Sequence, residues 1–206
     1  MARSFVAAFL SCLLSPFLFV QSAAQSPAQP IAPSIAQPAT CDYGAPHPNA
    51  PAEMSQFAFL IGDYAVSLHA WRGEAWSPPQ PGKTARWNGR YGLGGMAVID
   101  EWFNPDPEQD PDAPRGVNVR MYDPDAAEWD MMWVAAPGHQ VQDLRAKVKD
   151  GVLTMWQVYP EREDFYAEFV VEDDNRWSRV SYGKDDEGNW VKQFKLSASR
   201  IPCASQ

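Results

Sequence analysis

Hydrophobic and polar residues alternate along most of the chain between Phe57 and Arg200. The alternation has a period of two, which is typical of strands that bury one face. Turn-forming pairs such as Pro137-Gly138 and Asp150-Gly151 separate the alternating stretches. The pattern predicts ten strands, at residues 64–71, 84–93, 96–103, 116–122, 128–135, 140–148, 152–159, 164–171, 177–182 and 190–199.

No long helical pattern interrupts these strands, so the sequence excludes parallel strands joined by crossover helices. One short helix is predicted before the first strand, at residues 53–60. A series of short antiparallel strands removes its exposed edges by closing on itself. We therefore predict an all-β fold, a closed up-and-down antiparallel β-barrel of about 8–10 strands with a short N-terminal helix.

Two segments precede this domain. Residues 1–24 are typical of a secretory signal peptide, because Arg3 is followed by an apolar stretch and then by the small residues Ser22, Ala23 and Ala24. Residues 25–52 are rich in proline and are predicted to form an extended tether. The barrel domain is placed at residues 53–203, and we expect an exported protein that is periplasmic or extracellular.

The chain contains three cysteines. Signal cleavage removes Cys12 and leaves Cys41 and Cys203, one before the barrel and one at its end. In an exported protein this pair predicts a disulfide that joins the two ends of the domain, with two free thiols as the alternative. Lipidation of Cys12, as in a lipoprotein, is the alternative to signal cleavage after Ala24.

The charge limits the partners. The formal net charge is −9 and the pI is about 4.7. A polyanion repels nucleic acid and anionic lipid, so neither is expected as a partner. No stretch of sequence is apolar for long enough to predict a membrane span.

The entry into the first strand reads Phe57-Ala58-Phe59-Leu60-Ile61-Gly62-Asp63-Tyr64. It resembles the Gly-x-Trp entry of lipocalin-type (calycin) barrels, with Tyr64 in place of Trp. The domain as a whole resembles an uncharacterised lipocalin-like family of bacterial domains of unknown function, through residues 99–102, 119–124, 129–133, 176–177 and 188–190. The resemblance implies a barrel whose entry aromatic packs its closed end, and it implies little about function.

The strand at residues 96–103 has one carboxylate on each otherwise apolar face, Asp100 on one and Glu101 on the other. Whichever face points inward, a carboxylate goes with it, and a buried charge requires a partner or a proton. Arg120 on the next strand is the nearest candidate partner, and Arg90 on the preceding strand is the other. The pair is either a polar anchor or acid–base group in a pocket, or an ion pair at the barrel rim.

Aromatic residues at mid-strand positions would either fill the barrel or line a cavity, and a barrel of this size generally has room for a small ligand. One lysine, Lys192, shares a predicted strand face with Phe194 and Leu196, so it either reaches the lumen or extends into water. The candidate ligand-binding residues are Trp87, Tyr91, Asp100, Glu101, Arg120, Trp133, Trp156 and Lys192.

The sequence assigns no catalytic residue, metal site or cofactor. The three histidines, His47, His69 and His139, are far apart, and no Cys-x-x-Cys pair is present. The acidic residues between positions 104 and 112 alternate but lack the central Gly and final Glu of the helical calcium loop. No Gly-x-Ser-x-Gly elbow and no phosphate-binding loop occurs.

Three functions follow from these patterns. The first is a secreted protein that binds a small apolar or amphipathic molecule in the barrel lumen. The second is a barrel enzyme, an isomerase, cyclase or hydrolase, that uses an interior carboxylate together with Arg120. The third is a carbohydrate-binding β-domain, which requires a row of aromatic residues exposed to solvent.

Overall fold

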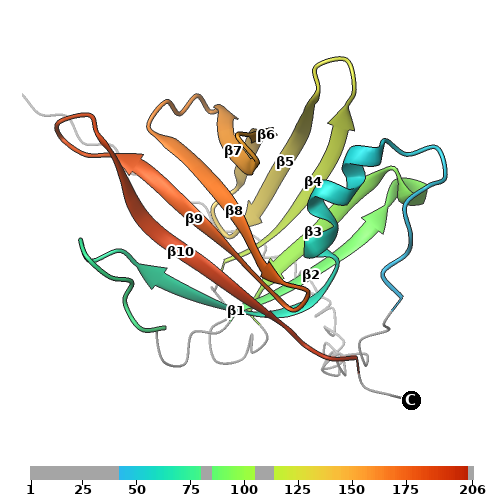
Figure 1. Ribbon diagram of the computed structural model, residues 1–206, viewed down its shortest axis with the longest axis horizontal. Helices are drawn as coiled ribbons and strands as arrows, with labels where there is room; N and C mark the ends of the chain where they lie inside the picture. The colour runs from blue at the N-terminus through green and yellow to red at the C-terminus, as the bar shows by residue number, and fades with distance from the viewer. Residues whose placement is uncertain (1–41, 80–84, 105–113, 204–206) are drawn as a thin grey trace, which may run out of the picture. The chain divides into compact units, whose positions relative to one another are not determined.

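A closed barrel of ten antiparallel strands makes up the part of the chain that the computed structural model describes, residues 42–79, 85–104 and 114–203 (Figure 1). A 3₁₀-helix precedes the first strand, and a short 3₁₀ turn joins the second strand to the third. The elements are η1 (Ala52–Leu60), β1 (Gly62–Ala70), β2 (Ala85–Gly92), η2 (Leu93–Gly95), β3 (Ala97–Phe103), β4 (Arg115–Asp123), β5 (Glu128–Ala136), β6 (Gln140–Lys149), β7 (Val152–Tyr159), β8 (Phe165–Asp173), β9 (Arg176–Lys184) and β10 (Trp190–Arg200).

Each strand pairs with the next along the chain, and β1 also pairs with β10 from Tyr64↔Arg200 to Ala70↔Phe194. This last pairing closes the barrel and confirms the predicted fold class, including the short N-terminal helix. Every predicted strand end lies within two residues of the observed one. The agreement follows from the period of two, because inward and outward positions alternate along each strand.

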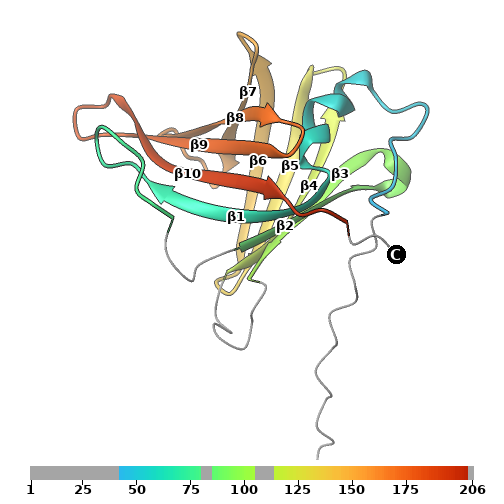
Figure 2. The same ribbon diagram turned by 60° about the horizontal axis from the view of Figure 1, so that its bottom comes forward.

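The helix η1 plugs one end of the barrel (Figure 2). Its residue Phe57 is fully buried and meets Trp129 and Phe169 edge to face, with ring centroids 4.8 and 5.5 Å apart. The backbone of η1 lies directly against β2, because a Cβ on Gly89 would overlap the carbonyl oxygen of Leu60. Aromatic packing and this close approach fill the plugged half of the barrel.

Tyr64, the aromatic of the strand entry, lies in the plugged half. Its hydroxyl donates to the carbonyl oxygen of Phe59 at 2.6 Å, and its ring packs against Trp177. The guanidinium of Arg200 donates to the carbonyl oxygen of Ile61 at 2.9 Å and also bonds the Tyr64 hydroxyl. These contacts join the beginning of β1 to the end of β10.

The segment before η1 packs on the barrel. The backbone N–H of Tyr91 donates to the carbonyl oxygen of Tyr43 at 2.8 Å, and that of His47 donates to Gly95 at 3.0 Å. The Tyr43 hydroxyl lies 3.9 Å from the sulfur of Cys203. The last part of the predicted tether is thus held by the barrel. Cys41 and the predicted signal peptide lie outside the described residues, so the disulfide stays a prediction.

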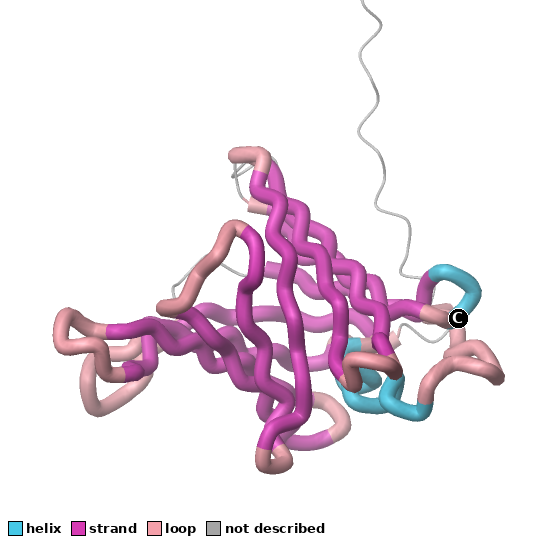
Figure 3. Tube along the Cα trace, turned by 90° about the horizontal axis from the view of Figure 1, so that it is seen from above, coloured by secondary structure: helices cyan, strands magenta, loops and turns pink. Residues whose placement is uncertain are grey.

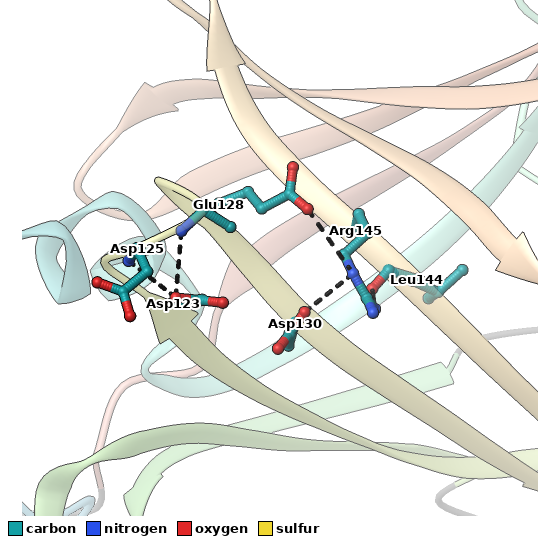
Figure 4. Close-up of polar contacts among 7 residues, drawn as sticks. Asp123, Asp125, Glu128, Asp130, Leu144 and Arg145 are labelled. Carbon is teal, nitrogen blue, oxygen red and sulfur yellow. Dashed lines mark hydrogen bonds and ion pairs between the residues drawn. The ribbon is translucent and has the colours of Figure 1, made fainter.

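The outer face is polar where β5 and β6 pair. The Arg145 guanidinium lies 2.9 Å from the Asp130 carboxylate and 3.8 Å from that of Glu128 (Figure 4). In the turn before β5, the Asp123 carboxylate accepts from the backbone N–H of Asp125 at 2.8 Å, which stabilises the tight turn (Figure 4).

Within the described ranges no helix covers the outside of the barrel, as Figure 3 shows. The same residues include no helix that is both long and apolar enough to cross a membrane.

Candidate ligand-binding cavity

The half of the barrel away from η1 contains a partly open cavity of about 480 Å³. All ten strands contribute to its lining, so side chains do not fill the whole lumen. The volume lies within the range of about 300–1,000 Å³ that is typical of small-molecule sites.

The walls of the cavity are mainly apolar. Trp102 on β3 and Trp133 on β5 lie on the lining with ring centroids 6.4 Å apart. Between them on β4 lies Gly116, where a Cβ would overlap the Trp133 ring. The absence of a side chain at this position lets the indole of Trp133 lie along the wall. Aliphatic and further aromatic side chains complete it, among them Leu144, Met155, Phe165, Phe194 and Leu196.

The end of the cavity nearest η1, which we call the floor, is polar. It is made by Trp87 on β2, Asn118 on β4 and Arg179 on β9. Directly beneath it, the carboxylate of Asp100 forms an ion pair with the guanidinium of Arg120. Both of these side chains are buried, with exposures of 0% and 1%.

Arg120 separates the two halves of the barrel. Its guanidinium lies 4.9 Å from the ring centroid of Phe57, on the plug, and 5.9 Å from that of Trp87, on the cavity floor. Aromatic faces favour a cation, so both rings help to compensate for its loss of hydration. The inward carboxylate is therefore Asp100 with Arg120, while Glu101 faces outward and lies 3.5 Å from Arg90.

Two guanidinium groups lie close together at the floor. Burial lowers the pKa of Arg179 to about 10, which leaves it protonated at neutral pH. Burial, and then the charge of Arg179, lower the pKa of Arg120. The adjacent Asp100 carboxylate acts in the opposite direction, because a negative charge favours the protonated guanidinium. The floor thus combines two cations with one carboxylate.

Several polar atoms at the floor are buried without a hydrogen-bond partner among the described residues. They are Nε1 of Trp87, Oδ1 of Asn118 and Nε of Arg179, and Nε1 of Trp102 on the adjoining wall. In the plugged half, Nε1 of Trp129 donates to Gln56 Oε1 at 2.9 Å, whereas Nε1 of Trp177 has no partner among the described residues. Buried polar atoms are normally paired, so this group of atoms is suited to hydrogen bonding with the cavity's contents.

The structure brings some predicted site residues together. Trp87 and Trp133 line the cavity, and Asp100 and Arg120 lie beneath its floor. Tyr91 is not part of the lining and packs instead against the core of the plugged half, where burial raises the pKa of its hydroxyl.

Three other predicted residues lie on the outside of the barrel. Glu101 is paired with Arg90, and Trp156 packs under the ammonium of Lys149 at 4.5 Å. The predicted face of Lys192 requires a correction, because a β-bulge between Lys192 and Phe194 shifts the register of β10. The lysine faces outward as a result, with its ammonium 4.9 Å from the ring of Trp71.

Sequence reasoning missed the most distinctive cavity residue, Arg179. The signal was present, because Arg179 follows Trp177 by two positions in an alternating strand. Asn118 was likewise two positions before Arg120. Trp102 likewise follows Asp100 by two positions, on the same face of β3. Gln142 on β6 and Gln157 on β7 also line the cavity. The alternation of inward and outward residues is interrupted in both strands, in β6 by a bulge between Asp143 and Leu144.

Within the described part of the chain, no group of three His, Cys, Asp or Glu side chains is placed to hold a metal ion. The acidic stretch considered for calcium lies almost entirely outside that part. No known protein family matches this chain, and no curated protein matches it either.

Proposed function

We propose that this chain is an exported, lipocalin-like binding protein that holds a small apolar or amphipathic molecule in its lumen. The observation that carries the proposal is the 480 Å³ cavity with indole and aliphatic walls. Burial of an apolar ligand against such walls is favourable by roughly 25 cal/mol per Å² of apolar surface removed from water. The polar floor then determines how the ligand is oriented.

Export and the lipocalin-like assignment rest on the sequence. The signal-like N-terminus supports secretion, and the Gly-x-Tyr entry supports kinship with calycin barrels. Tyr43 lies against Cys203 and is two residues from Cys41, a proximity that supports a disulfide between the two cysteines.

The enzyme alternative has less support. Asp100 has no exposed surface, is paired with Arg120 and does not line the cavity. A general acid or base has to reach the proton that it transfers, directly or through one water. Within the described residues, the cavity lining contains no Asp or Glu side chain.

The proposal can be tested with N-phenyl-1-naphthylamine, a neutral apolar probe whose emission rises on leaving water. Titration into the mature protein should give a saturable signal, together with quenching of tryptophan emission. Leu68→Trp, on the cavity lining, should weaken the signal by narrowing the cavity. Val170→Trp, at an exposed position on β8, is the matched control and should leave it unchanged. A wild-type protein that shows no saturable binding of apolar probes would refute the proposal.

One observation keeps the carbohydrate-binding function as a second candidate. On the outer face, Trp156, Tyr166 and Tyr182 are register partners across β7, β8 and β9. The two tyrosine rings are stacked, with centroids 4.5 Å apart and planes 4° apart. The two tyrosines cover one face of each other's rings, and all three aromatic residues are half-buried, so a sugar ring would stack on the ring faces that remain uncovered. The test is electrophoresis in native gels that contain soluble polysaccharides. Retardation of the wild-type protein that is lost in Trp156→Ala would support carbohydrate binding. Absence of retardation would exclude binding of the polysaccharides tested.

A further inference from the structure

We propose that the cavity selects amphipathic anions and binds them with the anionic head group at the floor, beside Arg179, and the apolar chain between the tryptophan walls. This inference rests on the proposed function and adds the chemical class and the orientation of the ligand.

The first step of the argument is the charge of the interior. Arg179 and Arg120 are both close to the floor, and Asp100 is the carboxylate that faces them. Arg120 forms an ion pair with Asp100, whereas no ion pair joins Arg179 to a described residue. Its contact is instead with a ring, because its guanidinium carbon lies 5.7 Å from the centroid of Phe194. The floor therefore has an excess of positive charge.

Arg179 is half-buried, and a cation that has lost part of its hydration without gaining a counter-ion is costly. An anionic head group beside Arg179 would supply the missing negative charge. The interaction would take place in surroundings of low polarity, because Trp87 and Asn118 on the same floor are only 3% and 4% exposed. Charges interact more strongly there than in water and are screened less by salt.

The second step is the balance of hydrogen-bond donors and acceptors. The indole nitrogens of Trp87 and Trp102 and the guanidinium of Arg179 can only donate. All three have a buried nitrogen without a partner among the described residues. Trp87 and Trp102 are cross-strand partners, so their two unpaired N–H groups come from adjacent strands. The fourth unpaired atom, Oδ1 of Asn118, is an acceptor, so the donors outnumber the acceptors three to one. A carboxylate, sulfate or phosphate consists of acceptors, so it matches most of this set better than a neutral alcohol does.

The third step is the orientation of the ligand. The polar floor lies at the plugged end, and mainly apolar walls extend from it toward the other end of the barrel. The lining also includes Arg162, whose guanidinium is already paired with Asp164 at 3.1 Å. Leu144, Met155 and Leu196 would contact the chain of the ligand. Since η1 blocks the barrel behind the floor, a chain attached to a head group at Arg179 can extend only away from the plug.

The experiment compares two ligands that differ in the head group, decanoate and decan-1-ol. Both are titrated calorimetrically into the mature protein at a pH where decanoate is ionised. Decanoate should bind at least about tenfold more tightly than the alcohol, as expected for a charge-assisted contact in a desolvated site. Arg179→Met should weaken decanoate binding by at least about tenfold and leave alcohol binding within about twofold.

The matched control is Arg90→Met. Arg90 is also a strand arginine, but it faces outward and is 41% exposed, so the substitution should not change either affinity. Arg179→Lys retains the charge and should retain the preference for decanoate. If Arg179→Met does not fold, the wild-type preference and the lysine variant decide the question.

Equal affinities of the wild-type protein for decanoate and decan-1-ol would overturn this inference and leave the proposed function intact. An Arg179→Met variant that keeps the preference would also overturn it. Failure of both ligands and of neutral apolar probes to bind would instead refute the proposed function.

Discussion

The plugged half and the cavity half of the barrel are built from the same strands, yet they use aromatic residues in opposite ways. In the plugged half Phe57 lies between Trp129 and Phe169, and the rings pack edge to face without room for a ligand. In the cavity half Trp102 and Trp133 face the partly open cavity. Without η1, the strands alone would leave Trp129 as open to the lumen as Trp133. The comparison shows that the plug, rather than the strands, decides which tryptophans belong to the core.

The two halves also differ in the surroundings of their buried polar groups. Trp129 has a partner for its indole N–H in Gln56 of η1, whereas Trp87 has none among the described residues. The ion pair of Asp100 and Arg120 lies at the boundary. Unpaired polar groups occur in both halves, since Nε1 of Trp177 also has no partner among the described residues, but those of the floor adjoin the cavity, where a ligand can use them.

The largest expected effect on stability comes from removing the buried aromatic ring of η1. Phe57→Ala should lower the free energy of unfolding by about 3–5 kcal/mol, because a buried ring is lost and a cavity remains. Phe194→Ala, which enlarges a cavity that already exists, should cost less than about 2 kcal/mol. Urea unfolding measures both, and equal losses would contradict the distinction between the two halves.

Substitution of Asp100 and Glu101 tests the ion pair at the boundary between the two halves. The two residues are adjacent in sequence and lie on opposite faces of β3. Asp100→Asn leaves Arg120 buried without its counter-charge and should cost about 3–5 kcal/mol. Glu101→Gln removes only an exposed ion pair and should cost less than about 1 kcal/mol. Thermal unfolding of the two variants would refute the assignment of the faces if Glu101→Gln were the more damaging.

The predicted bridge between Cys41 and Cys203 should stabilise both halves by about 2–5 kcal/mol, through the restriction that it places on the unfolded chain. Thiol titration of the denatured protein should detect no free thiol until a reductant is added. Cys203→Ser should lower the unfolding midpoint to that of the reduced wild-type protein. Free thiols in protein purified from the periplasm would show that the bridge does not form.

A smaller effect is expected from Gln56→Leu. This substitution leaves the indole N–H of the fully buried Trp129 unpaired and should cost about 1–3 kcal/mol. Ser55→Ala, an exposed neighbour on the same helix, should change the stability by no more than about 0.5 kcal/mol. Chemical unfolding followed by tryptophan emission measures both, and similar values would mean that the hydrogen bond contributes little.

The smallest effect concerns pH. Burial, followed by the Asp63 carboxylate, raises the pKa of Tyr43 from 10.0 to about 12. Since the folded protein holds this proton more tightly than the unfolded chain, the stabilising contribution is complete below pH 10.0 and is lost as the pH rises toward 12. Tyr43→Phe should therefore make the unfolding midpoint less dependent on pH in this range. An unchanged pH profile would contradict the assignment of the shift to Tyr43.

The period of two was enough to predict the ten strands, the closed barrel and an inward carboxylate near Arg120. These features depend on which residues alternate along each strand, and alternation can be read locally. Which of Asp100 and Glu101 points inward could not be read in this way, because both faces of β3 are apolar apart from these residues.

The sequence alone therefore determined the strand pattern and the need to close the sheet. Only the tertiary structure decided that Lys192 faces outward, because a single extra residue in a bulge reverses the faces of the residues before it. It also decided which half of the lumen is empty and that Arg179 lies at its floor. The volume that η1 fills, and the distance between side chains on β2, β4 and β9, depend on contacts between residues far apart in the chain. A local pattern does not encode such contacts.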